Sequence, residues 1–121
     1  MTLTTRLFNN GWLAAAYWVF CFALTHASFS PTSAPAIPHI DKAIHFLMYL
    51  LLARFLAPQM GRYGKNVRSG AAFTLFVIAL YASLDEWTQP YFDRTADIWD
   101  WTSDLAGALV GLYWGRKSLA R

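Results

Sequence analysis

Four apolar stretches, joined by short segments, limit what this chain can fold into. They run over about residues 7–29, 40–57, 70–87 and 98–115. Each reaches the lower limit of about 17 residues for a helix that crosses the hydrocarbon core of a bilayer. Charged residues make up 14% of the chain, against about 25% in a typical soluble domain. The sequence predicts an all-α membrane protein with four short transmembrane helices, forming a single polytopic domain over residues 1–121.

The segments between these stretches contain residues that interrupt helices. Pro31, Pro35 and Pro38 indicate a loop that is not helical throughout. The middle loop is expected over residues 61–66, and Pro90 is expected to end the third helix.

The first stretch has a second interpretation, as a signal peptide cleaved near Thr25-His26-Ala27. Its apolar run exceeds the 7–15 residues of a typical signal-peptide core, so a retained helix is favoured. A soluble pair of helical hairpins is another alternative, but the chain has too few polar residues to coat such a core. Cys21 is the one cysteine, which excludes an intramolecular disulfide and a cysteine-based metal site.

Lysine and arginine are unevenly distributed among the connecting segments. With the N-terminus placed inside the cell, eight of the ten basic residues lie on the inner side: Arg6, Arg54, Arg62, Lys65, Arg68, Arg116, Lys117 and Arg121. An excess of lysine and arginine in short loops marks the cytoplasmic side. Both the N- and C-termini are therefore predicted to be cytoplasmic. The basic residues serve topology and contacts with anionic membrane lipids, and no nucleic-acid partner is expected.

Polar residues recur every three or four positions near the outer ends of the last three stretches. They are Asp41, His45 and Tyr49; Tyr81, Asp85, Glu86 and Gln89; and Asp97, Asp100 and Asp104, continued by Gly107 and Gly111. Residues at this spacing share a helix face, and ionisable groups in membrane spans usually face a bundle interior or a wet cavity. We therefore expect a polar pocket at the outer membrane surface, with Arg94 at its mouth.

Some of these residues also have simpler interpretations. Asp41 and Asp97 lie where a helix N-terminus favours a negative charge, and His45 could be an interior histidine with satisfied hydrogen bonds. Gly107 and Gly111 are spaced for close helix packing, either within the bundle or between copies of the chain, so a homo-oligomer stays open.

The same residues carry a resemblance to the VanZ-like family of small bacterial membrane proteins, named for a member associated with teicoplanin resistance. The motifs are Asp41-Lys42-Ala43-Ile44-His45-Phe46, Asp85-Glu86-x-x-Gln89 and Arg94-x5-Asp100-x3-Asp104-x2-Gly107-x3-Gly111. Asp104 departs from the pattern, because many members have asparagine there. The resemblance implies a multi-pass protein of the bacterial cytoplasmic (inner) membrane with its functional face toward the periplasm or exterior. It also implies a link to the cell envelope or to antibiotic resistance.

The carboxylates favour a divalent cation, because oxygen-rich sites with one imidazole suit Mg²⁺, Mn²⁺ or Ca²⁺. Glu86, Asp100 and Asp104 are the candidate metal ligands. The outer position of the pocket points to a lipid headgroup or a lipid-linked envelope precursor as its partner.

Catalytic and substrate-binding roles can be assigned around that cation. His45, oriented by Asp41, is the candidate general acid or base, and Asp85 is a further candidate catalytic residue. The candidate substrate-binding residues are Arg94, Gln89, Lys42 and Tyr49, of which the arginine can hold a phosphate in bidentate fashion. The first hypothesis is metal-dependent hydrolysis or transfer at a phosphate ester.

A non-enzymatic role is the alternative hypothesis, and whether the protein is an enzyme stays open. The pocket would then bind an envelope lipid or confer tolerance to a glycopeptide antibiotic. An ion or proton path is disfavoured, because residues 47–53 and 73–79 offer almost no ionisable groups. No nucleotide-binding motif is present, and the three histidines, all toward the outer side, do not favour haem, so neither cofactor is expected.

Overall fold

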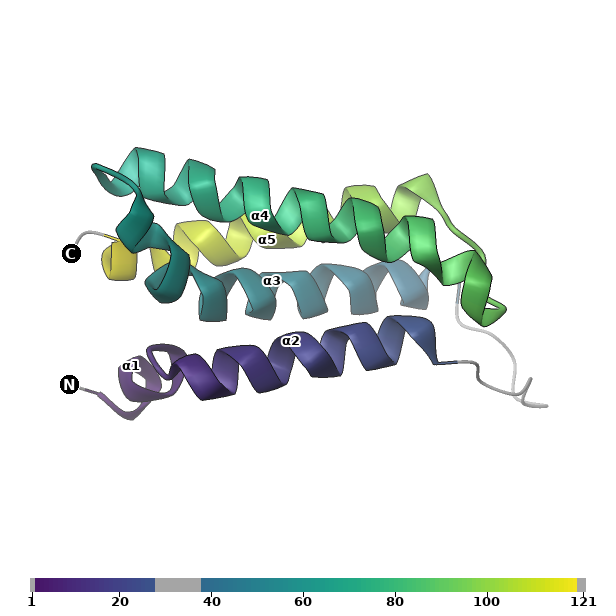
Figure 1. Cartoon of the computed structure of the whole chain (residues 1–121), viewed down its shortest axis with the longest axis horizontal. Coiled ribbons are helices and arrows are strands. Elements are labelled where there is room, and N and C mark those ends of the chain that lie inside the picture. Colours follow the sequence, from purple (N-terminus) through teal and green to yellow (C-terminus); the bar gives the residue numbers. More distant parts are fainter. Residues whose placement is uncertain (1, 28–37, 120–121) are drawn as a thin grey trace.

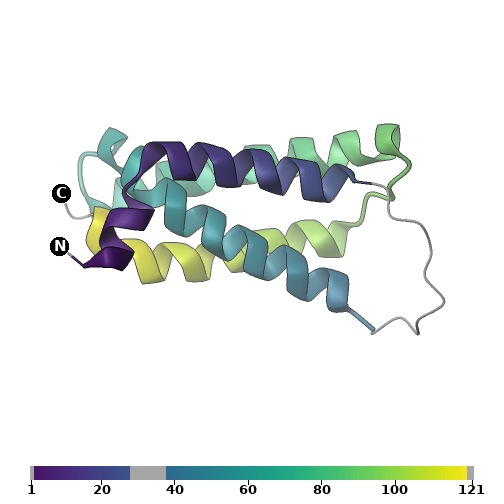
Figure 2. The same cartoon turned by 90° about the horizontal axis from the view of Figure 1, so that it is seen from below.

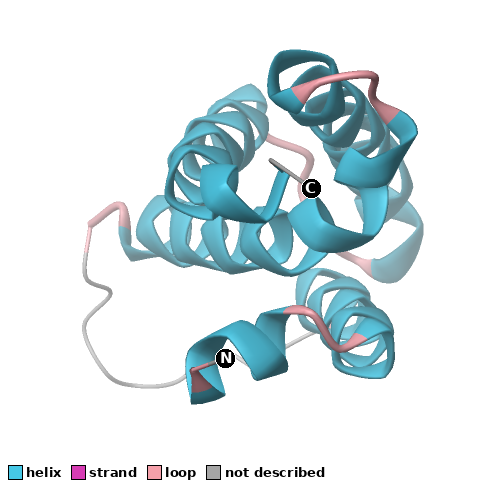
Figure 3. Cartoon of the chain, turned by 90° about the vertical axis from the view of Figure 1, so that its left-hand side faces the viewer, coloured by secondary structure: helices cyan, strands magenta, loops and turns pink. Residues whose placement is uncertain are grey.

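The computed structural model describes residues 2–27 and 38–119. The regular elements in these residues are all helices: α1 (Leu3–Phe8), α2 (Gly11–His26), α3 (Ile40–Met60), η1 (Gly61–Tyr63), α4 (Val67–Thr88), η2 (Gln89–Phe92) and α5 (Ile98–Leu119). The long helices α2, α3, α4 and α5 run side by side, with both chain ends at the same end of the bundle (Figure 1, Figure 2). Seen from that end, the short helix α1 lies across the bundle beside α2 (Figure 3).

The predicted all-α fold is confirmed in the described residues, and the membrane character is supported by one segment. Residues Val67–Phe92 are long and apolar enough to cross a membrane, whereas α2 is apolar but shorter. Charged residues at the start of α3 and of α5 lower the hydropathy of those helices. By length and composition, one helix in the part of the chain that the structure describes clearly qualifies as membrane-spanning, and the four spans stay a prediction.

The first apolar stretch differs from the expected helix over 7–29, because it is divided at Asn9 and Asn10. The side chain of Asn10 accepts hydrogen bonds from the backbone N–H groups of Trp12 (3.0 Å) and Leu13 (3.2 Å). These N–H groups have no partner within a helix that begins here, so asparagine is favoured at this N-cap. Residues 28 and 29 of the stretch, and most of the predicted proline-rich loop, lie outside the described residues.

The other long helices begin and end close to the predicted positions. Helix α3 continues three residues past position 57 and includes Pro58 in its last turn. Helix α4 begins at a capping box, in which Asn66 and Ser69 each accept a hydrogen bond from the other's backbone N–H. It ends at Thr88, just before Pro90, as predicted, and α5 continues to Leu119.

Helices α3 and α5 make the most extensive contact in the bundle, through glycines of α5. A Cβ atom added at Gly107 would overlap the carbonyl oxygen of Phe46, and one at Gly111 would overlap that of Leu50. Small residues at such positions let two helix backbones approach closely. The spacing of Gly107 and Gly111 therefore serves packing within the chain, and this contact fixes α5 against α3 at the end where the polar residues lie.

Candidate functional site

Polar side chains gather at the end of the bundle away from the chain termini. The first turns of α3 and α5 meet the last turns of α2 and α4 there (Figure 1). Four carboxylates are buried in this region: Asp85, Glu86, Asp100 and Asp104 are 1%, 8%, 7% and 0% exposed. Because burying a charge is costly unless it is paired, the partner of each carboxylate decides what the region can do.

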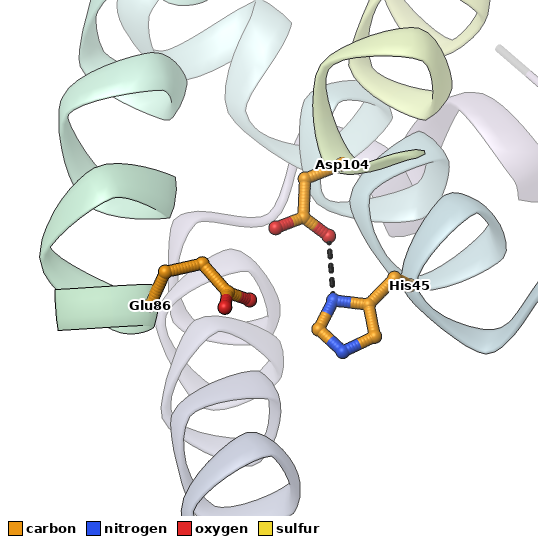
Figure 4. A group of neighbouring side chains, drawn as sticks. All are labelled: His45, Glu86 and Asp104. Atoms are coloured by element: carbon orange, nitrogen blue, oxygen red, sulfur yellow. Dashed lines mark hydrogen bonds and ion pairs between the residues drawn. The ribbon is translucent and has the colours of Figure 1, made fainter. Parts of the chain in front are cut away.

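One buried group consists of His45 on α3, Glu86 on α4 and Asp104 on α5 (Figure 4). One ligand atom from each residue lies within 4.8 Å of the other two. His45 Nδ1 is 2.8 Å from Asp104 Oδ1, so a protonated Nδ1 donates a hydrogen bond to that carboxylate. The other carboxylate oxygen, Oδ2 of Asp104, is buried and has no hydrogen-bond partner among the described residues.

Glu86 is held in place by two donors. Gln89 Nε2 donates to Oε1 at 3.1 Å, and the backbone N–H of Asp97 donates to Oε2 at 2.9 Å. The second bond joins the end of α4 to the segment that leads into α5. Glu86 is thus fixed at both oxygens, each of which retains lone-pair capacity for a further ligand.

Asp85 faces α2 and lies within hydrogen-bond distance of several donors. Thr25 donates to its Oδ1 at 2.7 Å, and Tyr81 does so at 3.4 Å. Tyr49 and Gln89 each lie 3.5 Å from Oδ2, and His26 Nδ1 lies 3.5 Å from Oδ1. This set of donors compensates the buried carboxylate, so the interactions of Asp85 tie α2 to α3 and α4.

Lys42 forms a second, more exposed cluster with three carboxylates. Its Nζ lies 2.6 Å from Asp41, 2.7 Å from Asp97 and 3.0 Å from Asp100. The hydrogen bond from Lys42 holds the pKa of Asp97 below its usual range. Asp100 also lies 3.6 Å from His45 Nε2, and Lys42 supplies its counter-charge. With Asp41 and Asp97, Asp100 forms a second group in which one carboxylate oxygen of each residue lies within 4.8 Å of the others.

A small cavity opens beside His45. Its volume is about 170 Å³, and its lining residues are Leu24, Thr25, Asp41, Ile44, His45, Met48 and Arg94. The guanidinium of Arg94 donates to the carbonyl oxygen of Ala27 at 3.0 Å, which holds this cation at the cavity. The cavity is large enough for a phosphate-sized group and too small for a whole lipid.

The structure brings most of the expected site residues together but changes their pairing. His45 contacts Asp104 of α5, whereas Asp41, expected to orient it, contacts Lys42. The residues missed by the sequence analysis are Thr25 and His26 of α2. The sequence signal that could have found Thr25 is its spacing of four residues from Cys21, which puts both on one face of α2, and both are buried.

The arrangement combines two chemical capacities. Glu86 and the free oxygen of Asp104 offer hard oxygen ligands from two helices, which suit Mg²⁺ or Mn²⁺. His45 is oriented by its bond to Asp104 and retains a second nitrogen, Nε2, for proton transfer. Both capacities depend on Asp104, which the fold buries completely.

Comparison with known proteins agrees with the resemblance carried by the sequence motifs. No curated protein and no solved structure matches the chain. The family model of VanZ/LLP1 matches residues 3–116, which include every residue of the site described above. With nearly the whole of its 121 residues matched, the chain belongs to the VanZ/LLP1 family.

Proposed function

We propose that this protein is a multi-pass membrane protein that binds a divalent cation through Glu86 and Asp104 and acts on the phosphate ester of an envelope lipid. The reaction would be hydrolysis or transfer at that ester. The observation that carries the proposal is the buried Oδ2 of Asp104, which lies next to Glu86 without a hydrogen-bond partner in the described chain. A carboxylate oxygen in that position is costly unless a cation or a proton occupies the space beside it.

The surface of the bundle supports four membrane spans. Each long helix exposes large apolar side chains, among them Val19 on α2, Leu47 on α3, Phe76 on α4 and Leu109 on α5. Apolar surface on every long helix is expected when lipid, not water, surrounds the bundle. The distribution of lysine and arginine then favours a topology with both termini in the cytoplasm, in which the carboxylates would lie at the outer face of the bacterial inner membrane.

The donor set fits a hard cation that also binds substrate. Mg²⁺ is usually held by one or two carboxylates, with the remaining positions taken by water and by phosphate oxygens. Glu86 and Asp104 would provide the two carboxylates, and the 170 Å³ cavity beside His45 would receive the phosphate. A bound cation would neutralise the phosphate charge and make the phosphorus atom easier to attack.

The residues around the cavity have separate roles in this proposal. Arg94 lines the cavity and would pair with the phosphate. His45, held by Asp104, would act as the general acid or base. Asp85 and Gln89 would position the neighbouring residues, because their hydrogen bonds are made within the protein.

The cation is tested first by thermal stability of the purified chain in detergent, after treatment with a chelator. Mg²⁺, Mn²⁺, Ca²⁺ and Zn²⁺ are added in turn to the wild type and to Glu86→Gln and Asp104→Asn, with Asp97→Asn as the control in the exposed cluster. A ligand that binds only the folded state stabilises it by about 2.7 kcal/mol at a hundredfold excess over its Kd. We expect a saturable rise in Tm with one ion, retained in Asp97→Asn and lost in Glu86→Gln. A response retained in Glu86→Gln would contradict the proposed ligands.

Catalysis is tested separately by phosphate release from lipid phosphates presented in mixed micelles. His45→Gln should abolish turnover and keep the Tm response to the cation, since His45 is assigned to proton transfer. Unchanged turnover in that variant would remove His45 from the mechanism. Loss of both turnover and the cation response would instead make His45 a metal ligand.

A non-enzymatic function is favoured by one observation, the extent to which the carboxylates hold helices together. Asp85 links α2 to α4, and Glu86 links α4 to the start of α5. The site would then fix the bundle, which would bind an envelope lipid or confer tolerance to a glycopeptide antibiotic. In that case Glu86→Gln should lower stability and resistance in proportion. A variant that folds normally and loses all function would count against this alternative.

A further inference from the structure

A second polar cavity lies at the opposite end of the bundle, next to the chain termini. Its volume is about 620 Å³, and it is formed by α1, α3 and α5. The lining residues are Thr5, Arg54, Val110, Tyr113, Trp114, Arg116 and Lys117. Three of them are cations, namely Arg54, Arg116 and Lys117.

Arg54 is the cation that the fold holds most firmly. Its side chain is 8% exposed, and its guanidinium lies 4.2 Å from the centre of the Phe8 ring and 5.6 Å from that of Trp114. Its Cδ lies against α5 at Gly115, where an added Cβ would be 3.4 Å away, at ordinary contact distance. Aromatic rings on which a guanidinium packs restrict its orientation.

The other two cations are exposed at the same cavity. Arg116 packs its guanidinium 4.1 Å from the centre of the Tyr113 ring, and Lys117 follows it on α5. Arginine forks match the oxygens of a phosphate in bidentate fashion. Val110, Tyr113 and Trp114 provide an exposed apolar wall beside these charges, as a ligand with a charged head and an apolar tail requires.

We infer that this cavity binds the phosphate group of an anionic lipid. The three cations recognise the phosphate, and the apolar wall favours a phosphate attached to a lipid over a free one. A volume of about 620 Å³ lies within the usual range for small-molecule sites. In the proposed topology this end faces the cytoplasmic leaflet, where anionic lipids attract basic residues. The site is separate from Glu86 and Asp104, so the test of lipid binding does not depend on whether the cation site exists.

The inference is tested by titrating the full chain, in an uncharged detergent, with short-chain phosphatidylglycerol while Tm is measured. Phosphatidylcholine of the same chain length reports the contribution of the acyl chains, and inorganic phosphate reports a free phosphate. The variant is Arg116→Gln/Lys117→Gln, whose side chains are exposed. The matched control is Lys65→Gln/Arg68→Gln, which removes the same charge at the same end of the bundle, outside the cavity.

We expect phosphatidylglycerol to raise the Tm of the wild type in a saturable manner, with phosphatidylcholine giving little change. The cavity variant should bind phosphatidylglycerol at least about tenfold more weakly, and the control should stay within about twofold of the wild type. Arg54→Lys, which keeps the charge and loses the planar fork, should also weaken binding.

Three results would overturn the inference. Equal weakening in the control variant would show a diffuse attraction between charges instead of a site. Stabilisation by phosphatidylcholine equal to that by phosphatidylglycerol would show that the phosphate charge is not recognised. Inorganic phosphate acting at the same concentrations as phosphatidylglycerol would exclude the lipid as the preferred source of the phosphate.

Discussion

Asp104 on α5 accepts a hydrogen bond from His45 on α3 at 2.8 Å, while its second carboxylate oxygen is buried without a hydrogen-bond partner in the described residues. One carboxylate therefore orients an imidazole with one oxygen and leaves the other for a ligand. Glu86, from a third helix, completes the group (Figure 4). This arrangement makes Asp104 the residue at which the cation proposal is most directly tested.

Replacing Asp104 by asparagine should have opposite effects with and without the cation. In chelator, Asp104→Asn should be at least as stable as the wild type, because the amide is neutral and can donate a hydrogen bond to Glu86; we expect a gain of about 1 kcal/mol. With the cation at saturation the wild type should be the more stable of the two. Thermal unfolding under both conditions checks this reversal. The same order of stability in both would contradict it.

The glycines of α5 should differ in their tolerance of alanine. Gly107→Ala and Gly111→Ala would each overlap a carbonyl oxygen of α3, so each should lower the free energy of unfolding by about 1–3 kcal/mol. Gly115→Ala is the matched control, because its added Cβ would lie 3.4 Å from the nearest atoms, at ordinary contact distance. Alanine is the better helix former, so this control should unfold at the wild-type temperature or higher. Equal effects at all three positions would mean that the close contact of α3 with α5 does not determine which glycines tolerate alanine.

Lys42→Met should reverse the pH dependence of stability at the exposed acidic cluster. In the wild type Lys42 holds the pKa of Asp97 below its usual value, so the stabilising contribution is present above the unfolded pKa of about 3.9. It is lost as the pH falls through the lower folded pKa. Without Lys42, Asp41 and Asp97 repel each other, and their protonation near pH 4 should raise stability. Tm of the wild type and of Lys42→Met is measured between neutral and acidic pH. A fall in Tm of both proteins on acidification would refute the prediction.

The sequence predicted the helices and the faces on which the polar residues lie, because both follow from spacing along one helix. It did not predict the partner of His45, which is 59 positions away on another helix. Helical spacing places Asp41 and His45 on one face, but the rotation of α3 against α5 decides which carboxylate the imidazole reaches. That rotation is fixed by Gly107 and Gly111 packing on α3, a relationship between helices that periodicity within one helix does not contain.

The division of the first apolar stretch was missed for a different reason. Asn9 and Asn10 are two polar residues in a long apolar run, and hydropathy averages over them. The structure shows that Asn10 caps α2, so local capping determined where that helix begins. The contribution of α2 to the site was missed as well, because Thr25 and His26 were considered only as part of a possible signal-peptide cleavage site.

The contact of α2 with the site leads to a last prediction, at Thr25. Its hydroxyl donates to the buried Asp85 at 2.7 Å, across the interface between α2 and α4. Thr25→Val keeps the shape and removes this donor. It should lower the free energy of unfolding by about 1–2 kcal/mol. Interhelical hydrogen bonds in membranes contribute less than this on average, but here the acceptor is charged. Thr102→Val is the matched control, because that hydroxyl is exposed and bonds only the carbonyl of Ile98 in its own helix. Unfolding in denaturing detergent should separate the two variants. If Thr25→Val matched the control, Asp85 would be satisfied by its remaining donors, and the Thr25 hydroxyl would contribute little to holding α2 against α4.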